Sequence, residues 1–294
     1  HSIDEMTNLS KDLREKLSEA FIINPISVDL LQKSKDGTIK NGVKLHDGLM
    51  VESVLIPTES RTTACVSSQV GCSLNCEFCA TAKLKRMRNL EVAEIVDQVA
   101  LIDKQSKLYF DRPLSNIVFM GMGEPMMNYK NVVDAIKKIT DEDGLGMSAR
   151  RITVSTSGIP KMMRMLADEN LKVKLALSLH SAIEHKRNEI MPFSTKFPLT
   201  EIMEAMQYWY SKTENRITFE YCVWKGINDG DEDIKALIKY CRQVPCKVNL
   251  IQYNPIGEGK FDHRSVEAEE RYVRELEKAG ITVLVRRSRG GDID

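Results

Sequence analysis

The chain has 294 residues, of which 42 % are hydrophobic and 29 % charged, a composition typical of a globular protein with one large core or two ordinary domains. Its 42 Lys and Arg residues balance its 42 Asp and Glu residues, so any nucleic acid would have to be bound by a local basic patch. No stretch approaches the roughly 18 consecutive apolar residues of a membrane span, and residues 1–8 lack the pattern of a secretory signal. These features predict a cytoplasmic protein without a membrane partner.

Residues 1–60 are predicted to form an N-terminal extension built from a helical segment and β-structure. A polar helix is expected over residues 8–20 and a strand over residues 50–56. The residues between them contain three pairs that are typical of hairpin turns, namely Asp36-Gly37, Asn41-Gly42 and Asp47-Gly48. We therefore expect a small β-element that packs on the domain that follows.

Residues 61–294 alternate β-rich runs with helical patterns, which indicates repeated βα units around a parallel sheet. Strands are predicted at residues 62–66, 115–120, 151–155, 173–179, 216–222, 247–253 and 282–286. Helices are predicted near residues 90–106, 129–140, 160–167, 199–211, 231–243 and 266–279. The fold class is thus α/β, a complete or partly open TIM-like barrel, whose chemistry belongs in the loops after the carboxyl ends of its strands.

The most informative motif follows the first barrel strand, where Cys72, Cys76 and Cys79 have the spacing CxxxCxxC. Three thiolates on a four-iron cluster leave one iron open to chelate a substrate. An alternative is a structural zinc site with Cys65 as the fourth ligand. That alternative is disfavoured because no second CxxC pair or His pair is evident. The remaining cysteines, Cys222, Cys241 and Cys246, are predicted to be inert core thiols.

With Phe78 before the last cysteine, this loop resembles that of the radical S-adenosylmethionine (SAM) superfamily, whose partial (β/α)6 barrel agrees with the strand count. A second motif, at residues 121–125, follows a strand and offers glycines for close backbone approach and an acid, Glu124, that can bind an ammonium group. It resembles the superfamily's GGE-type motif, which binds the amino group of the methionine moiety.

Across nearly the whole chain, the sequence is similar to the RlmN/Cfr family of radical SAM RNA methyltransferases. The segments that carry the similarity are residues 51–54, 64–69, 71–79, 120–125, 155–158, 177–180, 254–255 and 291–294. The resemblance implies SAM contacts at Gly123, Glu124, Ser155, Ser178, Leu179, His180 and Asn254. It also implies that Glu52 is the general base and that the thiol of Cys65 resolves a protein–RNA adduct.

The implied reaction is methylation of C2 of adenine 2503 in 23S rRNA and of adenine 37 in tRNA. It would use a 4Fe-4S cluster, two SAM molecules per turnover, an electron donor such as flavodoxin, and a monomeric enzyme. In the family, a methyl-carrying cysteine follows three residues after the position of Asp294, and the N-terminal accessory domain is longer. We therefore expect a trimmed or partly ordered enzyme. Residues 83–88 and Gly291 depart from the family pattern.

Two alternatives remain open. One is Cfr-like methylation at adenine C8, although the continuation of residues 125–128 resembles RlmN instead. The other is a zinc-stabilised RNA-binding protein without catalysis. For RNA contacts, three basic groups are predicted to flank the active-site loops, and their members are Lys83, Lys85, Arg86 and Arg88, then Arg150 and Arg151, then Arg286, Arg287 and Arg289.

Overall fold

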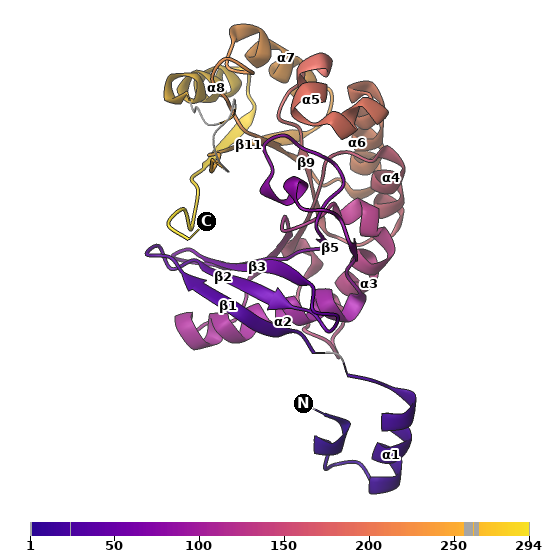
Figure 1. Cartoon of the computed structure of the whole chain (residues 1–294). Helices are drawn as coiled ribbons and strands as arrows, with labels where there is room; N and C mark the ends of the chain where they lie inside the picture. Colours follow the sequence, from indigo (N-terminus) through magenta and orange to yellow (C-terminus); the bar gives the residue numbers. More distant parts are fainter. Residues whose placement is uncertain (1, 24, 256–260, 262–264, 294) are drawn as a thin grey trace.

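The fold is organised by one large sheet. A computed structural model describes residues 2–23, 25–255, 261 and 265–293, and its ten-stranded sheet has the order β1-β2-β3-β4-β7-β8-β9-β10-β11-β12. The seven strands of this sheet from β4 onward are parallel. The N-terminal strands are antiparallel: β1 pairs with β2, β2 with β3, and β3 with β4. Figure 1 shows helices along the outer side of this curved sheet.

The parallel part is the predicted partial barrel. Its strands are β4 (Thr62–Cys65), β7 (Asn116–Phe119), β8 (Ile152–Thr156), β9 (Lys174–Ser178), β10 (Ile217–Tyr221), β11 (Cys246–Ile251) and β12 (Thr282–Arg286). Its helices are α2 (Val92–Phe110), α3 (Tyr129–Thr140), α4 (Pro160–Asp168), α5 (Glu184–Ile190), α6 (Leu199–Thr213), α7 (Asp231–Cys241) and α8 (Val266–Lys278). Six strand–helix units and a closing strand confirm the expected (β/α)6 architecture; only the short α5 was not predicted.

Burial explains why these segments form strands. All five residues of β10 are buried, since a parallel strand is covered by helices on one face and by the barrel interior on the other. Phe219 points into the core between sheet and helices, where Leu177 and Trp209 are also fully buried. Its neighbour Glu220 therefore points the other way, into the barrel.

The N-terminal region extends the sheet instead of forming a separate layer. It contains α1 (Lys11–Ala20), β1 (Ser27–Lys33), β2 (Ile39–Lys44) and β3 (Met50–Pro57), and α1 lies apart from the barrel in Figure 1. Gly37 and Gly48 adopt φ angles of +87° and +82° in turns, as predicted. The predicted turn at Asn41-Gly42 is wrong, because both residues lie within β2 and Asn41 is fully buried.

The end of the chain is attached to this hairpin. Figure 1 shows the C-terminal segment running from β12 to the β1–β2 turn. The N–H of Gly290 donates to Asp36 Oδ2 (3.0 Å), and the N–H of Lys35 donates to Asp292 Oδ2 (3.1 Å). Ser34 also donates to Asp292. The two ends of the sheet, β1 and β12, are thereby connected through the tail.

Within the described ranges, no helix combines the length and the hydropathy needed to cross a membrane.

Candidate active site

The cysteine loop starts at the carboxyl end of β4, as predicted. A two-stranded ladder that the sequence did not predict closes its base, formed by β5 (Gln69–Val70) and β6 (Arg88–Asn89). Gly71 has a φ angle of +72°, and a Cβ atom there would lie 2.3 Å from the carbonyl oxygen of Lys85. Only glycine fits this close crossing. The loop therefore projects as a closed unit that carries Cys72, Cys76 and Cys79.

The three cysteines of the loop are free thiols that influence one another. Burial raises the pKa of the Cys76 thiol, and Cys79 and Cys72 raise it further, so cations must replace the protons before all three are thiolates. No three Cys, His, Asp or Glu side chains of the described residues are arranged to hold one ion. A zinc site needs its thiolates about 2.3 Å from one ion, whereas the cysteines of a four-iron cluster bind different irons.

Glu124 is fixed at the end of β7 by its neighbours. Gly123 has a φ angle of +93°, and a Cβ atom there would lie 2.4 Å from Cβ of Gln69. Gln69 Oε1 accepts from the N–H of Glu124 (2.9 Å). The buried carboxylate accepts from the N–H groups of Met126 (3.1 Å) and Ser157 (2.8 Å). Burial raises the pKa of Glu124 and these bonds oppose it, which leaves an anchored acid suited to an ammonium group.

The other predicted SAM contacts lie at the carboxyl ends of successive strands. Ser155 is in β8, and Ser178 ends β9 opposite Glu220. The N–H groups of Leu179 and His180 point to the carbonyl oxygen of Glu220, at 3.0 and 3.4 Å. After β11, Asn254 accepts a hydrogen bond from Ser288. The structure thus gathers the predicted contacts on one edge of the sheet.

His180 connects this edge to the cysteine loop. Its Nδ1 accepts from the N–H of Cys222 (3.2 Å), which assigns the neutral tautomer with its proton on Nε2. Burial lowers the pKa of His180 to about 3, with a further contribution from Arg187. The imidazole packs edge-on against Phe78, with ring centroids 4.6 Å apart. His180 therefore stays uncharged at neutral pH and supports the aromatic residue of the cysteine motif.

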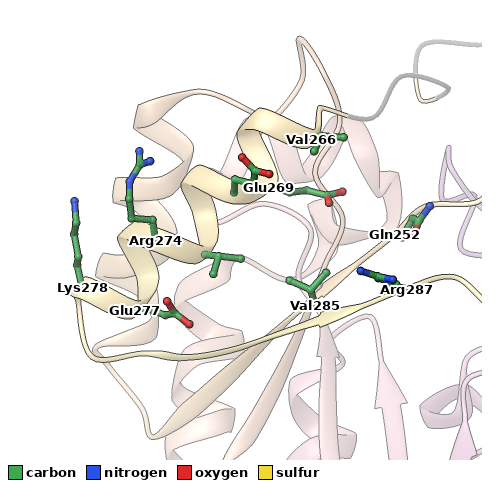
Figure 2. A pocket seen from close by; sticks show the side chains of 10 residues that line it. Gln252, Val266, Glu269, Arg274, Glu277, Lys278, Val285 and Arg287 are labelled. Carbon is green, nitrogen blue, oxygen red and sulfur yellow. The ribbon is translucent and has the colours of Figure 1, made fainter. Parts of the chain in front are cut away.

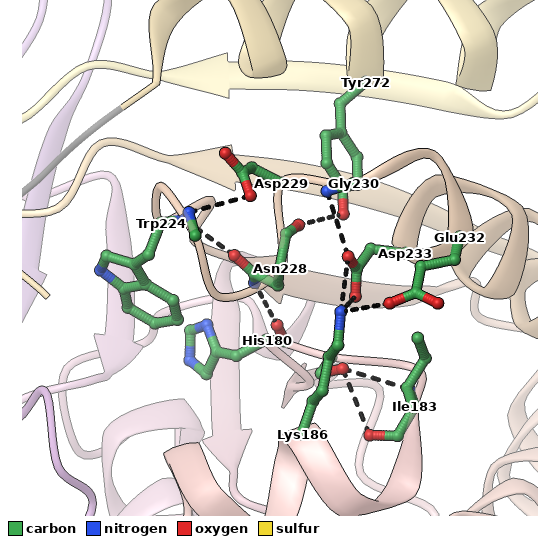
Figure 3. Close-up of polar contacts among 12 residues, drawn as sticks. His180, Ile183, Lys186, Trp224, Asn228, Asp229, Gly230, Glu232, Asp233 and Tyr272 are labelled. Carbon is green, nitrogen blue, oxygen red and sulfur yellow. Dashed lines mark hydrogen bonds and ion pairs between the residues drawn. The ribbon is translucent and has the colours of Figure 1, made fainter. Parts of the chain in front are cut away.

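A buried polar network holds the loops after β9 and β10 (Figure 3). The amide of Asn228 donates to the carbonyl oxygens of His180 (2.6 Å) and Cys222 (2.9 Å), and Asn228 Oδ1 accepts from the N–H of Trp224 (2.8 Å). Tyr272 donates to the carbonyl oxygen of Asn228 (2.7 Å). This network was not predicted, because nothing in the local sequence distinguishes Asn228 from an ordinary turn residue.

Cys65 and Glu52 lie on the same face of the sheet. Cys65 in β4 pairs with Val54 in β3, and Glu52 is two residues from Val54, so its side chain points to the same face. Burial raises the pKa of Cys65 to about 11, opposed by a hydrogen bond from the Met120 backbone and by the charge of Arg286. The Glu52 side chain is exposed. The two predicted catalytic side chains thus face the same space.

Polar groups that sequence reasoning missed line the barrel interior. Asn249 Nδ2 donates to Glu220 Oε1 (2.9 Å), and both residues are at most 5 % exposed. Among the described residues, Glu220 Oε2, Asn249 Oδ1 and Ser157 Oγ have no hydrogen-bond partner. Buried groups of this kind usually bind water or a ligand, which fits a polar cofactor here. The available signal was Glu220 itself, a charged residue in an otherwise buried strand.

The residues predicted to contact RNA differ in their surroundings. Lys83 and Lys85 are exposed beside the cysteine loop, whereas Arg88 is ion-paired to Asp47 (2.6 Å) and Glu94 (2.8 Å). Arg86 donates to Asn89 and Arg289 is exposed. Arg150 and Arg151 precede the first residue of β8, so they lie at the amino ends of the strands. The expectation that they flank the active-site loops is therefore wrong.

The C-terminal arginines face different sides of β12. Arg286 lies 3.8 Å from the buried Glu220 and so points into the barrel. Arg287 lines a groove of about 630 Å³ between α8 and β12, together with Glu269, Arg274 and Glu277 (Figure 2). This groove lies beside α8, away from the cysteines. None of the predicted cluster or SAM ligands lines it.

Comparisons with known proteins identify the superfamily. The model of the radical SAM superfamily matches residues 66–241. The crystal structure of a radical SAM methyltransferase from Sphaerobacter thermophilus superposes with a TM-score of 0.94 and 39 % identity, covering 99 % of this chain and 86 % of that one. Fold and cysteine loop together define a radical SAM enzyme, a class that uses a 4Fe-4S cluster and SAM.

The nearer relatives define the family within that class. The "probable dual-specificity RNA methyltransferase RlmN" of Christiangramia forsetii is 66 % identical over the whole of this chain and 84 % of its own length. The "dual-specificity RNA methyltransferase RlmN" of Geotalea uraniireducens is 43 % identical over 98 % of this chain and 82 % of its own length. The chain belongs to the RlmN family.

Proposed function

We propose that this chain methylates C2 of adenine in 23S rRNA and in tRNA by radical chemistry. The observation that carries the proposal is the closed cysteine loop at the carboxyl end of β4, next to the anchored Glu124. The dual-specificity names of the relatives support the RNA substrates.

The cofactors would occupy the carboxyl edge of the barrel. Cys72, Cys76 and Cys79 would hold the 4Fe-4S cluster. SAM would contact the residues predicted from the family pattern, which are Gly123, Glu124, Ser155, Ser178, Leu179, His180 and Asn254. Cluster and SAM together supply a carbon-centred radical that can remove hydrogen from an unactivated methyl group. Such activation is needed because adenine C2 is not nucleophilic enough for direct methyl transfer. Each turnover would use two SAM molecules.

Glu52 and Cys65 would complete the reaction after the new carbon–carbon bond forms. The exposed carboxylate of Glu52 accepts the proton from C2. The sulfur of Cys65 attacks the sulfur of the methyl-carrying cysteine that follows position 294 in this family. A disulfide forms as the bond from that sulfur to the methylene carbon breaks, and the carbon takes the electron pair and a proton, which leaves the methyl group on C2 and releases the RNA. With a pKa of about 11, Cys65 must lose its proton before it attacks, and the charge of Arg286 favours that loss.

RNA would approach the edge that holds the cysteine loop. Lys83, Lys85 and Arg86 lie beside this loop and suit phosphate contacts. The target adenine must leave its stack to reach the barrel interior. A flavodoxin-like protein is proposed as the electron donor.

The test is product analysis by mass spectrometry of RNA digested after anaerobic turnover with the full-length protein, SAM and a reductant. We expect 2-methyladenosine in 23S rRNA and tRNA fragments, and none with Cys76→Ala. Formation of 8-methyladenosine would instead support the Cfr-like alternative. No methylation by protein with a full cluster would contradict the proposal.

A further inference from the structure

Arg187 is a buried cation with unused hydrogen-bond donors. It lies in α5 and is 0 % exposed. Its Nη2 donates to the carbonyl oxygens of Ser157 (2.5 Å) and Ser178 (3.3 Å). Its Nε and Nη1 have no partner in the part of the chain that the structure describes. The charge of Glu184 acts on Arg187, but no described residue, Glu184 included, accepts a hydrogen bond from Nε or Nη1. Buried guanidinium donors without partners are strongly unfavourable, so a further anion is expected to be bound beside them.

The surroundings of Arg187 indicate where that anion lies. One turn further along α5, the carbonyl oxygen of Ile190 accepts from the N–H of Glu77 in the cysteine loop (3.1 Å). The helix is therefore attached directly to that loop. On the other side of Arg187, its carbonyl partner Ser178 is two residues from His180, whose ring packs against Phe78 of the cysteine loop with centroids 4.6 Å apart. Arg187 thus lies between the ends of β8 and β9 and the loop that carries Cys76.

We propose that Arg187 is the counter-cation of the iron–sulfur cluster that the cysteine loop would hold, with Nε and Nη1 as the donors available to it. The inference rests on the proposed function, because it presupposes the cluster. Reduction adds one negative charge to the cluster, so a fixed neighbouring cation stabilises the reduced form more than the oxidised form. Arg187 would be a positioning and tuning residue that favours electron uptake without reacting itself.

The test is an anaerobic redox titration of the reconstituted full-length protein without SAM, monitored by electron paramagnetic resonance. Arg187→Gln removes the charge and should shift the midpoint potential to a more negative value. Arg187→Lys keeps a charge but not the planar donor array, so its midpoint potential should lie between those of the wild-type protein and Arg187→Gln. The control is Lys186→Gln, because Lys186 is ion-paired 2.9 Å from Asp233, and it should leave the potential unchanged. Unchanged potentials in both Arg187 variants would overturn the proposal.

Two further measurements separate this role from others. Far-UV circular dichroism and iron content show whether each variant folds and loads its cluster. If Arg187→Gln folds without iron, Arg187→Lys should restore the iron, and a folded Lys variant without iron would overturn the charge argument. Weaker SAM binding with an unchanged potential would assign Arg187 to the SAM carboxylate and also overturn it. Wild-type protein without iron would contradict the proposed function itself.

Discussion

Two buried polar pairs, one in the N-terminal hairpin region and one in the barrel, differ in how completely they are satisfied. Asn41 in β2 and Gln105 in α2 exchange reciprocal amide hydrogen bonds of 3.0 and 2.6 Å. Glu220 and Asn249 share one bond of 2.9 Å and, within the described ranges, leave one oxygen each without a partner. The Asn41–Gln105 pair is closed, because each amide bonds to the other, and it holds β2 against α2. The open pair leaves hydrogen-bonding capacity inside the barrel, as do the unused donors of Arg187, and we expect a ligand to use it.

The largest effect is expected from replacing the cysteines of the loop, because they would hold the cluster on which SAM cleavage depends. Replacing Cys72, Cys76 or Cys79 by Ala should lower the iron content from about four per chain to near zero and abolish SAM cleavage. Cys241→Ala is the matched control, because Cys241 is a buried thiol in α7, and it should keep both properties. Iron analysis and a 5′-deoxyadenosine assay measure the outcome. Equal losses at all four positions would show that the ligands are misassigned.

A later block is expected at Cys65. In the full-length protein, Cys65→Ala should still bind iron and still carry the methyl group, because Cys65 acts only after the adduct forms. RNA covalently attached to protein should therefore accumulate on a denaturing gel with labelled RNA. Normal iron without any cross-linked band would refute the resolving role. Lost iron would instead point to Cys65 as a metal ligand.

The two polar pairs should respond in opposite ways to single substitutions. Gln105→Leu leaves the buried Asn41 without its partner and should lower the free energy of unfolding by about 2 kcal/mol. Glu220→Gln removes a buried charge and should not lower the stability of the apoprotein, but it should weaken SAM binding about tenfold or more. Thermal unfolding and equilibrium SAM binding provide the two readouts. The comparison fails if Glu220→Gln destabilises the apoprotein as much as Gln105→Leu.

The smallest effect concerns the tail at the hairpin. Burial alone would raise the pKa of Asp36, but hydrogen bonds from Thr38, Gly290 and Ser34 lower it from 3.8 to about 2. A lowered carboxyl pKa contributes stability above about pH 4 that is lost as the pH falls towards 2. Titration of the Asp36 carboxyl by nuclear magnetic resonance should show this midpoint, and a chain ending at Arg286 should titrate higher. Identical midpoints in the two chains would contradict the tail contact.

The sequence predicted the barrel well because its signals are local. Apolar β-runs and helical periodicity located the strands and helices of the barrel, and the cysteine spacing located the loop on β4. The Asn41-Gly42 error has a physical cause, since the buried contact of Asn41 with Gln105 outweighs the local preference of the pair for a turn. The SAM and catalytic residues came from the family resemblance, and their roles remain predictions.

The features that were missed depend on contacts between distant segments. Arg187 follows the end of β9 by nine residues in a short helix without a sequence signal, and its carbonyl partners are Ser157, just after β8, and Ser178, the last residue of β9. Arg150 and Arg151 are a different kind of error. Arg150 precedes and Arg151 begins the predicted strand at residues 151–155, so the chain direction of a parallel strand already places them at its amino end.

The most direct test of the account is the metal content of wild-type protein purified without oxygen. A four-iron cluster on the cysteine loop should make the protein brown, with about four irons and four sulfides per chain. Stoichiometric zinc without iron would contradict it, because Cys72, Cys76 and Cys79 would then hold a single structural ion.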